Sequence, residues 1–161
     1  MKALKRVMAS EYSRELSQKV FEGMKGMIKR GLWAGSIPGY GLRRMLVSSE
    51  GEPKQIMEYG DRKNLRSDRT ILVLGPPEEI KWIREIYRMF IEEKRSSIYI
   101  AGVLNRKNVR NWASLWTNQS VLNILTHEKY TGSLVWGRWT QKLRTRMIPV
   151  ARQNWTILPV P

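Results

Sequence analysis

Residues 11–18, EYSRELSQ, place a tyrosine, an arginine and a serine close together in the chain. A nucleophile for DNA strand transfer would need a serine hydroxyl near a basic side chain, so Ser17 is the first candidate for chemistry. Such a serine also needs a base that takes its proton, and the single histidine, His127, is remote in sequence. We therefore expect Ser17 to be a helix-surface residue and the chain to carry no catalytic residue.

The element that must hold this stretch is a helix predicted from about Met8 to Arg30, with Ser10 as its N-cap. Its apolar residues recur every four positions. Because this step exceeds the 3.6-residue turn by about 40°, the apolar stripe winds around the helix and can contact more than one partner. The stripe consists of Met8, Tyr12, Leu16, Val20, Met24 and Ile28.

The chain has no cysteine and one histidine. Disulfide scaffolds, thiol catalysis and thiolate zinc sites are therefore excluded, and we expect neither a metal nor a cofactor. No apolar run approaches the roughly 20 residues that a membrane-spanning helix needs, and no signal-peptide block follows the basic start. The expected location is intracellular.

Charge is the strongest global property, because 29 lysines and arginines against 14 acidic residues give a formal net charge of +15. The acidic residues are also segregated. None occurs in 23–49, 94–127 or 129–161, whereas they collect in 50–68 and 78–93. A phosphate-binding face needs positive potential without neighbouring carboxylates, so this pattern predicts a polyanionic partner, with nucleic acid as the leading class.

Residues 31–41, GLWAGSIPGYG, are rich in glycine. They follow a predicted helix and precede a predicted strand, whereas a phosphate-binding loop follows a strand and opens a helix. Two interpretations remain open: a turn whose glycines need positive φ, or a segment that lies against a DNA backbone or in a minor groove.

Short strands and helices alternate in the rest of the chain. A sheet is predicted from strands at 41–47, 70–74 and 132–138, with a further short strand around 55–59. Helices are predicted at 78–93, 97–107 and 118–127. The expected class is α+β, a small helical domain with a short antiparallel sheet, preceded by a long protruding N-terminal helix.

The apolar sides of the three shorter helices predict the core. In the helix at 78–93, opened by Pro76 or Pro77, this side consists of Ile80, Ile83, Tyr87, Phe90 and Ile91. In the two later helices it consists of Ile100, Ala101, Leu104, Val121, Ile124 and Leu125.

The helices at 97–107 and 118–127 resemble a helix-turn-helix, although their connector is too long for a strict one. Asn118, Gln119 and Asn123 lie at the start of the second helix. Their amides suit adenine edges in a major groove but are equally typical of a solvated first helical turn, and both interpretations stay open.

Trp112, Trp116, Trp136 and Trp139 interleave with basic residues. In a single-strand binder such aromatic side chains stack on bases. For Trp112, Trp116 and Trp136 we favour core packing at a helix–strand junction, whereas Trp139 is open between the two roles.

Several motifs occur in a recognisable order. The first helix ends in Arg30-Gly31, a Gly/Pro turn ends in Tyr40-Gly41, and the second helix begins with PPEE; IAGVLN and WTNQSVLNILTHEKYTG follow. This series, over about residues 8–140, resembles the recombinase domain of the large serine recombinases, the family of phage integrases and transposon resolvases.

In that family an N-terminal catalytic domain carries the nucleophilic serine. A long helix, which contacts a dimer partner and crosses the DNA, leads into the DNA-binding recombinase domain, and a cysteine-ligated zinc ribbon and a coiled coil commonly follow. The resemblance implies a connecting helix at 1–31, a recombinase DNA-binding domain at 32–140 and a basic C-terminal extension at 141–161.

The chain departs from the family pattern in several places. It lacks the catalytic domain and, having no cysteine, the zinc ribbon, so we expect that it does not cleave DNA by itself. The turn reads Pro38-Gly39-Tyr40-Gly41 where the family usually has Pro-Tyr-Gly-Tyr, and 48–68 is an enlarged loop.

The resemblance and the charge pattern together predict sequence-specific binding of duplex DNA, as the recognition portion of a site-specific serine recombinase that integrates or excises mobile DNA. The expected partners are a double-stranded attachment site and, through the N-terminal helix, a serine recombinase catalytic domain or a second copy. The expected location is the cytoplasm of a bacterium or phage host, at the nucleoid. The expected DNA contacts are Lys29, Arg30, Arg43, Arg44, Arg106, Lys107, Arg110, Asn118, Gln119, Asn123, Arg138, Lys142, Arg144 and Arg146.

Two other functions remain as alternatives. One is a serine recombinase complete in this chain, which would form a covalent adduct between Ser17 and DNA. The other is a protein-interaction module that works through the N-terminal helix, with an incidental basic surface and negligible affinity for duplex DNA.

Overall fold

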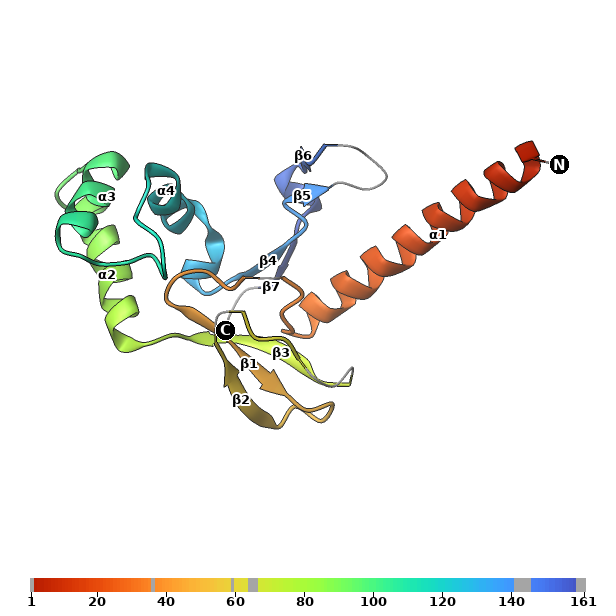
Figure 1. Cartoon of the computed structure of the whole chain (residues 1–161), viewed down its shortest axis with the longest axis horizontal. Coiled ribbons are helices and arrows are strands. Elements are labelled where there is room, and N and C mark those ends of the chain that lie inside the picture. The colour runs from red at the N-terminus through yellow and green to blue at the C-terminus, as the bar shows by residue number, and fades with distance from the viewer. Residues whose placement is uncertain (1, 36, 59, 64–66, 141–145, 159–161) are drawn as a thin grey trace. The chain divides into compact units, whose positions relative to one another are not determined.

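The computed structural model describes residues 2–35, 37–58, 60–63, 67–140 and 146–158 (Figure 1). The chain divides into two compact units, one of residues 35–131 and one that combines 1–34 with 132–161. The described elements confirm the predicted α+β class, with a long N-terminal helix, shorter helices and a small antiparallel sheet. The functional division predicted at residues 31 and 140 stays a prediction.

The sheet of the 35–131 unit has three antiparallel strands in the order β2-β1-β3. Central β1 is paired along both edges, so that Met45 lies opposite Ile56 on one side and Ile71 on the other. The strands are β1 (Leu42–Val47), β2 (Pro53–Met57) and β3 (Arg69–Leu74).

The prediction that residues 132–138 join this sheet was wrong. Its third strand is β2, close to the short strand predicted around 55–59, and a local hairpin forms it. Ser48 Oγ accepts hydrogen bonds from the N–H groups of Glu50 and Glu52, at 3.2 and 3.1 Å, and Gly51 has a φ of 93°. With β2 and β3 along its two edges, β1 has no edge left for a further strand.

Three helices follow the sheet, and their ends agree closely with the predicted ones. Pro77 lies in the first turn of α2, where its missing N–H costs nothing. Ser96 caps α3, and Thr117 and Ser120 form a capping box at the start of α4. These elements are α2 (Pro77–Ile91), α3 (Ser97–Arg106) and α4 (Asn118–Thr126), with a 3-10 turn at Glu128–Thr131.

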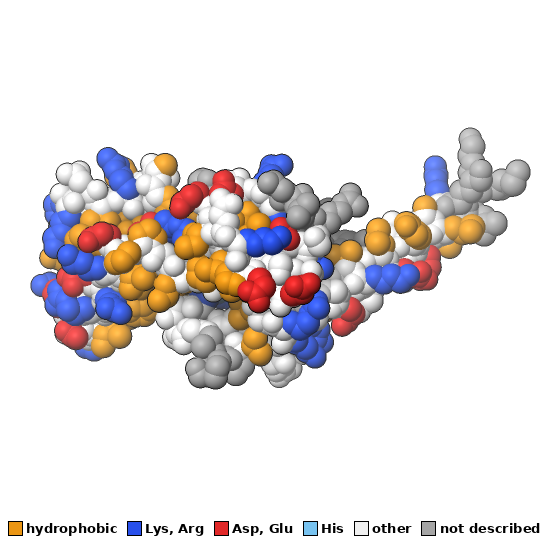
Figure 2. Space-filling model, turned by 90° about the horizontal axis from the view of Figure 1, so that it is seen from below, with side chains coloured by type: hydrophobic (Ala, Val, Ile, Leu, Met, Phe, Trp, Pro, Cys, Tyr) orange, Lys and Arg blue, Asp and Glu red, His pale blue; other side chains and the backbone are white. Residues whose placement is uncertain are grey.

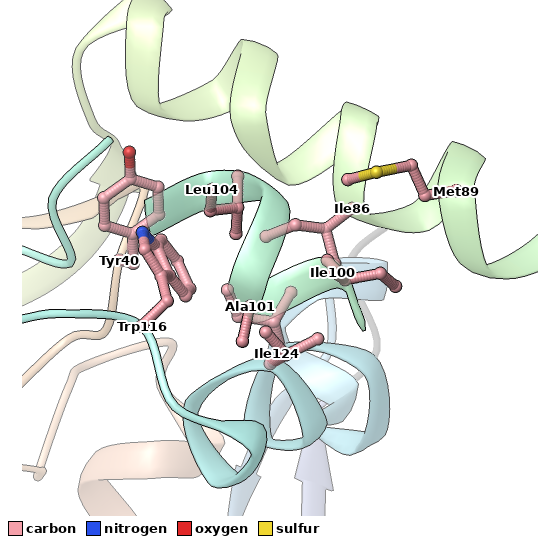
Figure 3. Close-up of a cluster of buried hydrophobic side chains, with 9 residues drawn as sticks. Tyr40, Ile86, Met89, Ile100, Ala101, Leu104, Trp116 and Ile124 are labelled. Atoms are coloured by element: carbon pink, nitrogen blue, oxygen red, sulfur yellow. The ribbon is translucent and has the colours of Figure 1, made fainter. Parts of the chain in front are cut away.

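The core of this unit lies where the three helices meet (Figure 3). Ile86 of α2 points toward Ile100 of α3, and both are fully buried, as are Leu104 and Val121. The predicted apolar sides of α3 and α4 are therefore confirmed for these positions.

The predicted apolar side of α2 was wrong in its last turn. Met89 is 3 % exposed, whereas Phe90 and Ile91 are 42 % and 56 % exposed. Successive helical residues point about 100° apart, so Met89 and Phe90 cannot both face the core, and the core takes Met89.

The other unit is built on α1 (Lys2–Lys29). The C-terminal part of α1 packs on two short paired strands: the ring centroid of Phe21 lies 4.8 Å from that of Trp136, and Ile28 is fully buried. The remaining elements form two ladders and a 3-10 turn: β4 (Leu134–Trp136) with β7 (Thr156–Leu158), β5 (Trp139–Thr140) with β6 (Ile148–Pro149), and Arg152–Asn154.

The prediction that Ser10 caps the first helix was wrong, because α1 already begins at Lys2. Ser10 Oγ instead donates to the Val7 carbonyl oxygen from inside the helix, at 2.8 Å. The residues before it include several good helix formers and neither glycine nor proline, so nothing stops the helix from extending. Across the described part of the chain, no helix combines the length and apolarity needed to span a membrane.

Candidate nucleic-acid interface

The connector between α3 and α4 is fixed at its far end by one side chain. Asn105, in the last turn of α3, donates from Nδ2 to the Trp116 carbonyl oxygen and accepts at Oδ1 from the Trp116 N–H, both at 2.9 Å. Trp116 is itself buried, edge-on to the Tyr40 ring at 4.8 Å (Figure 3). Because Thr117 caps α4 directly after Trp116, the Asn105 clamp sets where α4 begins relative to α3.

The start of α4 presents an exposed row of amides. Asn118, Gln119 and Asn123 are all exposed, while Val121 and Ile124 bury the opposite side of the helix. Gln119 Nε2 donates to Asn123 Oδ1 at 3.0 Å, and the Ser97 hydroxyl donates to Asn118 Oδ1. The structure therefore places the three amides predicted from sequence on the exposed side of one helix, with Asn118 and Gln119 in its first turn and Asn123 one turn later.

Three basic residues predicted to contact DNA lie shortly before α4 in sequence, and all three are exposed. Arg106 ends α3, and Lys107 and Arg110 follow in the connector. The ammonium of Lys107 lies 5.4 Å from the centroid of the Trp82 ring. No acidic residue occurs between 94 and 127, so carboxylates of this segment cannot neutralise these charges.

Arg43 and Arg44 differ sharply, although they are neighbours on β1. The Arg43 side chain is only 14 % exposed and donates to both carboxylate oxygens of Glu79, at 2.7 and 3.0 Å. These hydrogen bonds raise the pKa of Arg43 above its ordinary value. Arg44 points to the opposite face of the strand, where it donates to the Asp61 carbonyl oxygen at 2.8 Å. Arg43 therefore holds the sheet to the first turn of α2.

The glycine-rich segment is a turn, as one of the two interpretations predicted. Gly39 and Gly41 have φ values of 100° and 75°, and Pro38 and Tyr40 are buried. A Cβ atom on Gly41 would overlap Cδ1 of Ile83. The segment is also tied down by Glu79, which accepts from the Gly41 N–H at 2.8 Å. Residues 38–41 thus serve the packing of the 35–131 unit.

The unit that contains α1 holds the remaining predicted contacts. Lys29 and Arg30 are exposed at the end of α1, and Arg30 Nε donates to the Gly26 carbonyl oxygen at 3.2 Å. Arg138 is half-buried between β4 and β5, and Arg146 is exposed before β6. Lys142 and Arg144 lie outside the described residues.

The tryptophans divide as the packing interpretation predicted. Trp116 is buried in the core, Trp112 packs against that core, and Trp136 contacts Phe21. Trp139 is 54 % exposed.

The catalytic interpretation of residues 11–18 gains no support from the geometry. Ser17 lies within α1, which is helical for many residues on both sides of it. In the part of the chain that is described, no three histidine, aspartate or glutamate side chains gather in a way that would hold a metal ion.

Sequence reasoning missed the residues that position the amide row. Besides Asn105, these include Tyr130, whose hydroxyl donates to the Tyr40 carbonyl oxygen at 3.0 Å, and Lys129, which donates to that of Pro38 at 2.7 Å. Burial raises the pKa of Tyr130 well above its ordinary value. The motifs IAGVLN and EKYTG contain these residues, but motif order alone does not tell which backbone group each side chain meets.

A comparison with protein-family models finds one described as Recombinase, which matches residues 77–160, slightly more than half of the chain. This match begins at α2 and includes α3, α4 and β4 to β7. Neither the curated proteins nor the solved structures contain a match to the chain.

Proposed function

The chain belongs to the recombinase family, and from this premise we propose that it binds duplex DNA as the recognition portion of a site-specific serine recombinase. The observation that carries the proposal is the exposed amide row on α4. The Asn105 clamp holds the start of this helix, and the segments before and after the helix are poor in acidic residues. Family membership supports a role in site-specific recombination, and the amide row supplies a surface for reading bases.

The amides of α4 have the hydrogen-bonding groups that an adenine edge requires. The bond between Gln119 and Asn123 uses the nitrogen of the first amide and the oxygen of the second. This bond does not use the carbonyl oxygen of Gln119 or the NH₂ group of Asn123, which can accept and donate further hydrogen bonds. An acceptor and a donor side by side complement N6–H and N7 of adenine in the major groove.

Phosphate contacts supply most of the affinity in this proposal. Arg106, Lys107 and Arg110 are exposed just before α4 in the chain, and we expect them to contact the DNA backbone beside it. Arg44 of the same unit and Lys29 and Arg30 of the other unit are further expected phosphate contacts. Arg43 is committed to Glu79, and we expect no phosphate contact from it. Lys142, Arg144 and Arg146 of the C-terminal segment stay predicted DNA contacts. We expect the protein to be located at the nucleoid of a bacterium or phage host.

Strand cleavage is assigned to another catalytic domain rather than to this chain. The docking surface for such a domain, or for a second copy, is the apolar row of α1. Tyr12 is 68 % exposed, and Leu16 and Val20 are about half exposed, at 48 % and 49 %. Figure 2 shows apolar side chains along one side of this helix. A mobile-DNA integration or excision reaction would then combine cleavage by the partner with recognition by this chain.

A titration of duplex DNA at several salt concentrations tests the proposal. If about six to eight basic side chains reach phosphates, log K should fall with log salt at a slope of about −5 to −7. Negligible affinity that does not depend on salt would instead support the protein-interaction module. A covalent adduct between Ser17 and supercoiled plasmid would support a complete recombinase and contradict our assignment.

Base reading is tested separately from phosphate binding. Gln119→Ala and Asn123→Ala should each lower the preference for a specific site by about 1 to 3 kcal/mol and leave non-specific binding unchanged. Gln55→Ala, which removes an exposed amide on β2, is the matched control. Equal losses on specific and non-specific DNA would show that the row does not read bases. The specific site is found first by selection from random duplexes.

A further inference from the structure

Two arginines converge on one indole ring in the unit that contains α1. Cζ of Arg138 lies 5.2 Å from the Trp155 ring centroid, and Cζ of Arg152 lies 5.8 Å from the same centroid. Tryptophan is the best partner for such cation–π contacts, in which the ring meets the face of the guanidinium and the N–H groups point along its edge. One ring therefore orients two strong donors of phosphate hydrogen bonds.

The ring itself is fixed by the backbone. Trp155 Nε1 donates to the Val150 carbonyl oxygen at 2.7 Å, and the Val150 N–H donates to the Arg138 carbonyl oxygen at 2.9 Å. These two bonds join Trp155 to Val150 and Val150 to Arg138, and the Trp155 N–H donates to the Arg152 carbonyl oxygen at 3.0 Å. Because the ring is held in place, the guanidiniums stacked on it lose less conformational freedom when they bind a ligand.

The charge around the cluster favours an anion. No acidic residue occurs from Lys129 to Pro161, so the two positive charges approach one ring without a carboxylate supplied by their own segment. In addition, Arg138 Nε is buried and has no hydrogen-bond partner within the described structure. A buried donor of this kind is uncommon in folded proteins.

We propose that Arg138 and Arg152, stacked on Trp155, form a site for the phosphodiester backbone of DNA. Phosphate oxygens match the planar N–H edge of arginine, and a pair of guanidiniums can bind one phosphate from two sides or two phosphates of one strand. The site rests on the proposed function, since it assumes that the chain binds duplex DNA, and it adds Arg152 and Trp155 to that function. We name it the arginine–tryptophan site.

This placement gives the second unit its own contact with DNA. The chain passes between the units at residues 34–35 and again at 131–132. Once α4 is bound, the arginine–tryptophan site binds in an intramolecular step, at a high effective concentration of DNA. A contact that reads no bases then raises the affinity for every sequence and leaves the preference between sequences to α4.

The test separates guanidinium geometry from charge. In the double variant R138K/R152K the net charge stays at that of the wild type, but the planar, stacked N–H edges are lost. We expect affinity for a duplex of random sequence to fall on the order of tenfold. The matched control is R62K/R84K, which makes the same exchange at two exposed arginines of the other unit and should bind as the wild type.

A second variant keeps the test independent of folding. Arg152 is exposed, so Arg152→Gln leaves the packing intact, and the salt slope should become shallower by about 1 because one phosphate contact is lost. Wild-type affinity in R138K/R152K, or an unchanged slope in Arg152→Gln, overturns the site while DNA binding by the wild type still stands. Absence of salt-dependent binding in the wild type overturns the proposed function and the site with it.

Discussion

The two units of the chain bury their apolar residues to very different extents. In the 35–131 unit, side chains from three helices meet in one cluster, and Ile86, Ile100, Leu104 and Val121 are completely buried. In the unit of α1, burial is concentrated at the C-terminal end of the helix, around Ile28, and the apolar side chains nearer its N-terminus are exposed. The first unit buries apolar side chains in one core, whereas the second leaves an apolar row exposed on α1, where we propose that a partner binds.

Polar contacts follow the same division. The 35–131 unit is tied by hydrogen bonds between residues far apart in sequence, such as Arg43 with Glu79 and Lys129 with the Pro38 carbonyl. Along α1, side-chain hydrogen bonds join residues three or four positions apart in the same helix, as Gln18 with Glu22 and Arg30 with the Gly26 carbonyl do. The long-range bonds support α4, the helix that we propose reads bases, whereas the bonds along α1 hold the helix itself and leave its apolar row exposed.

The largest expected effect separates the two apolar surfaces. Leu104→Ala removes a fully buried side chain of the 35–131 unit and should lower the free energy of unfolding by about 3 kcal/mol, because a cavity is left behind. Leu16→Ala on α1 removes a side chain of the same type that is 48 % exposed and should cost about 0.5 kcal/mol or less. Urea unfolding of the isolated chain measures both. Equal losses would contradict the comparison.

The ion pair between Arg43 and Glu79 tests how much the long-range polar contacts stabilise the 35–131 unit. Their side chains are 14 % and 18 % exposed, so Glu79→Gln leaves a largely buried guanidinium without its charged partner. We expect a loss of about 2 kcal/mol in the free energy of unfolding, below the full cost of a broken buried pair because some solvent remains. Glu85→Gln, which alters a more exposed pair with Arg88 on α2, is the control and should cost clearly less.

The Asn105 clamp connects stability with recognition. Asn105→Ala leaves the N–H and carbonyl of Trp116 without their partner, and we expect a loss of about 1 to 2 kcal/mol in unfolding free energy. Specific DNA binding should fall more than non-specific binding, since the start of α4 is no longer fixed. Asn105→Asp keeps the acceptor for the Trp116 N–H but sets a carboxylate oxygen against the Trp116 carbonyl oxygen, so it should not restore stability or specific binding. Equal loss of both kinds of binding would contradict a positioning role.

The smallest expected effect concerns the core of the 35–131 unit at high pH. Burial raises the pKa of Tyr40 from 10.0 to about 12. Between these values the tyrosine ionises in the unfolded chain but stays neutral in the folded one, so unfolding releases a proton and stability falls as pH rises from about 10 to 12. Tyr40→Phe removes this contribution and should flatten the decline in thermal midpoint over that window. A decline identical to that of the wild type would contradict it.

Local features of the structure could be predicted from the sequence, and distant pairings could not. The start of α4 at residue 118 and the proline start of α2 depend on neighbouring residues, and both were predicted. The pairing of β1 with β3 was also predicted, whereas the partner of β4 and the bonds of Asn105 depend on segments that meet only in the folded chain. The assignment of 132–138 to the sheet failed for this reason: its strand character was visible, but its partner, β7, was not.

The candidate site shows the same limit. Periodicity placed Asn118, Gln119 and Asn123 on a helix start, and the structure has them exposed there. Arg43 and Arg44 looked equivalent in sequence, yet alternation along the strand sends one into an ion pair and the other to the opposite face. Charge counting cannot distinguish an arginine that holds the fold from one that is available to DNA.

The clamp on Trp116 also bears on how such proteins can diverge. Asn105 ties the start of α4 directly to α3, and the connector between them also packs on the core through Val109 and Trp112. The orientation of α4 is therefore set by contacts that lie apart from its exposed amides. If α4 reads bases as we propose, a new target sequence can be acquired by changing exposed side chains of α4 while the contacts that orient the helix stay the same.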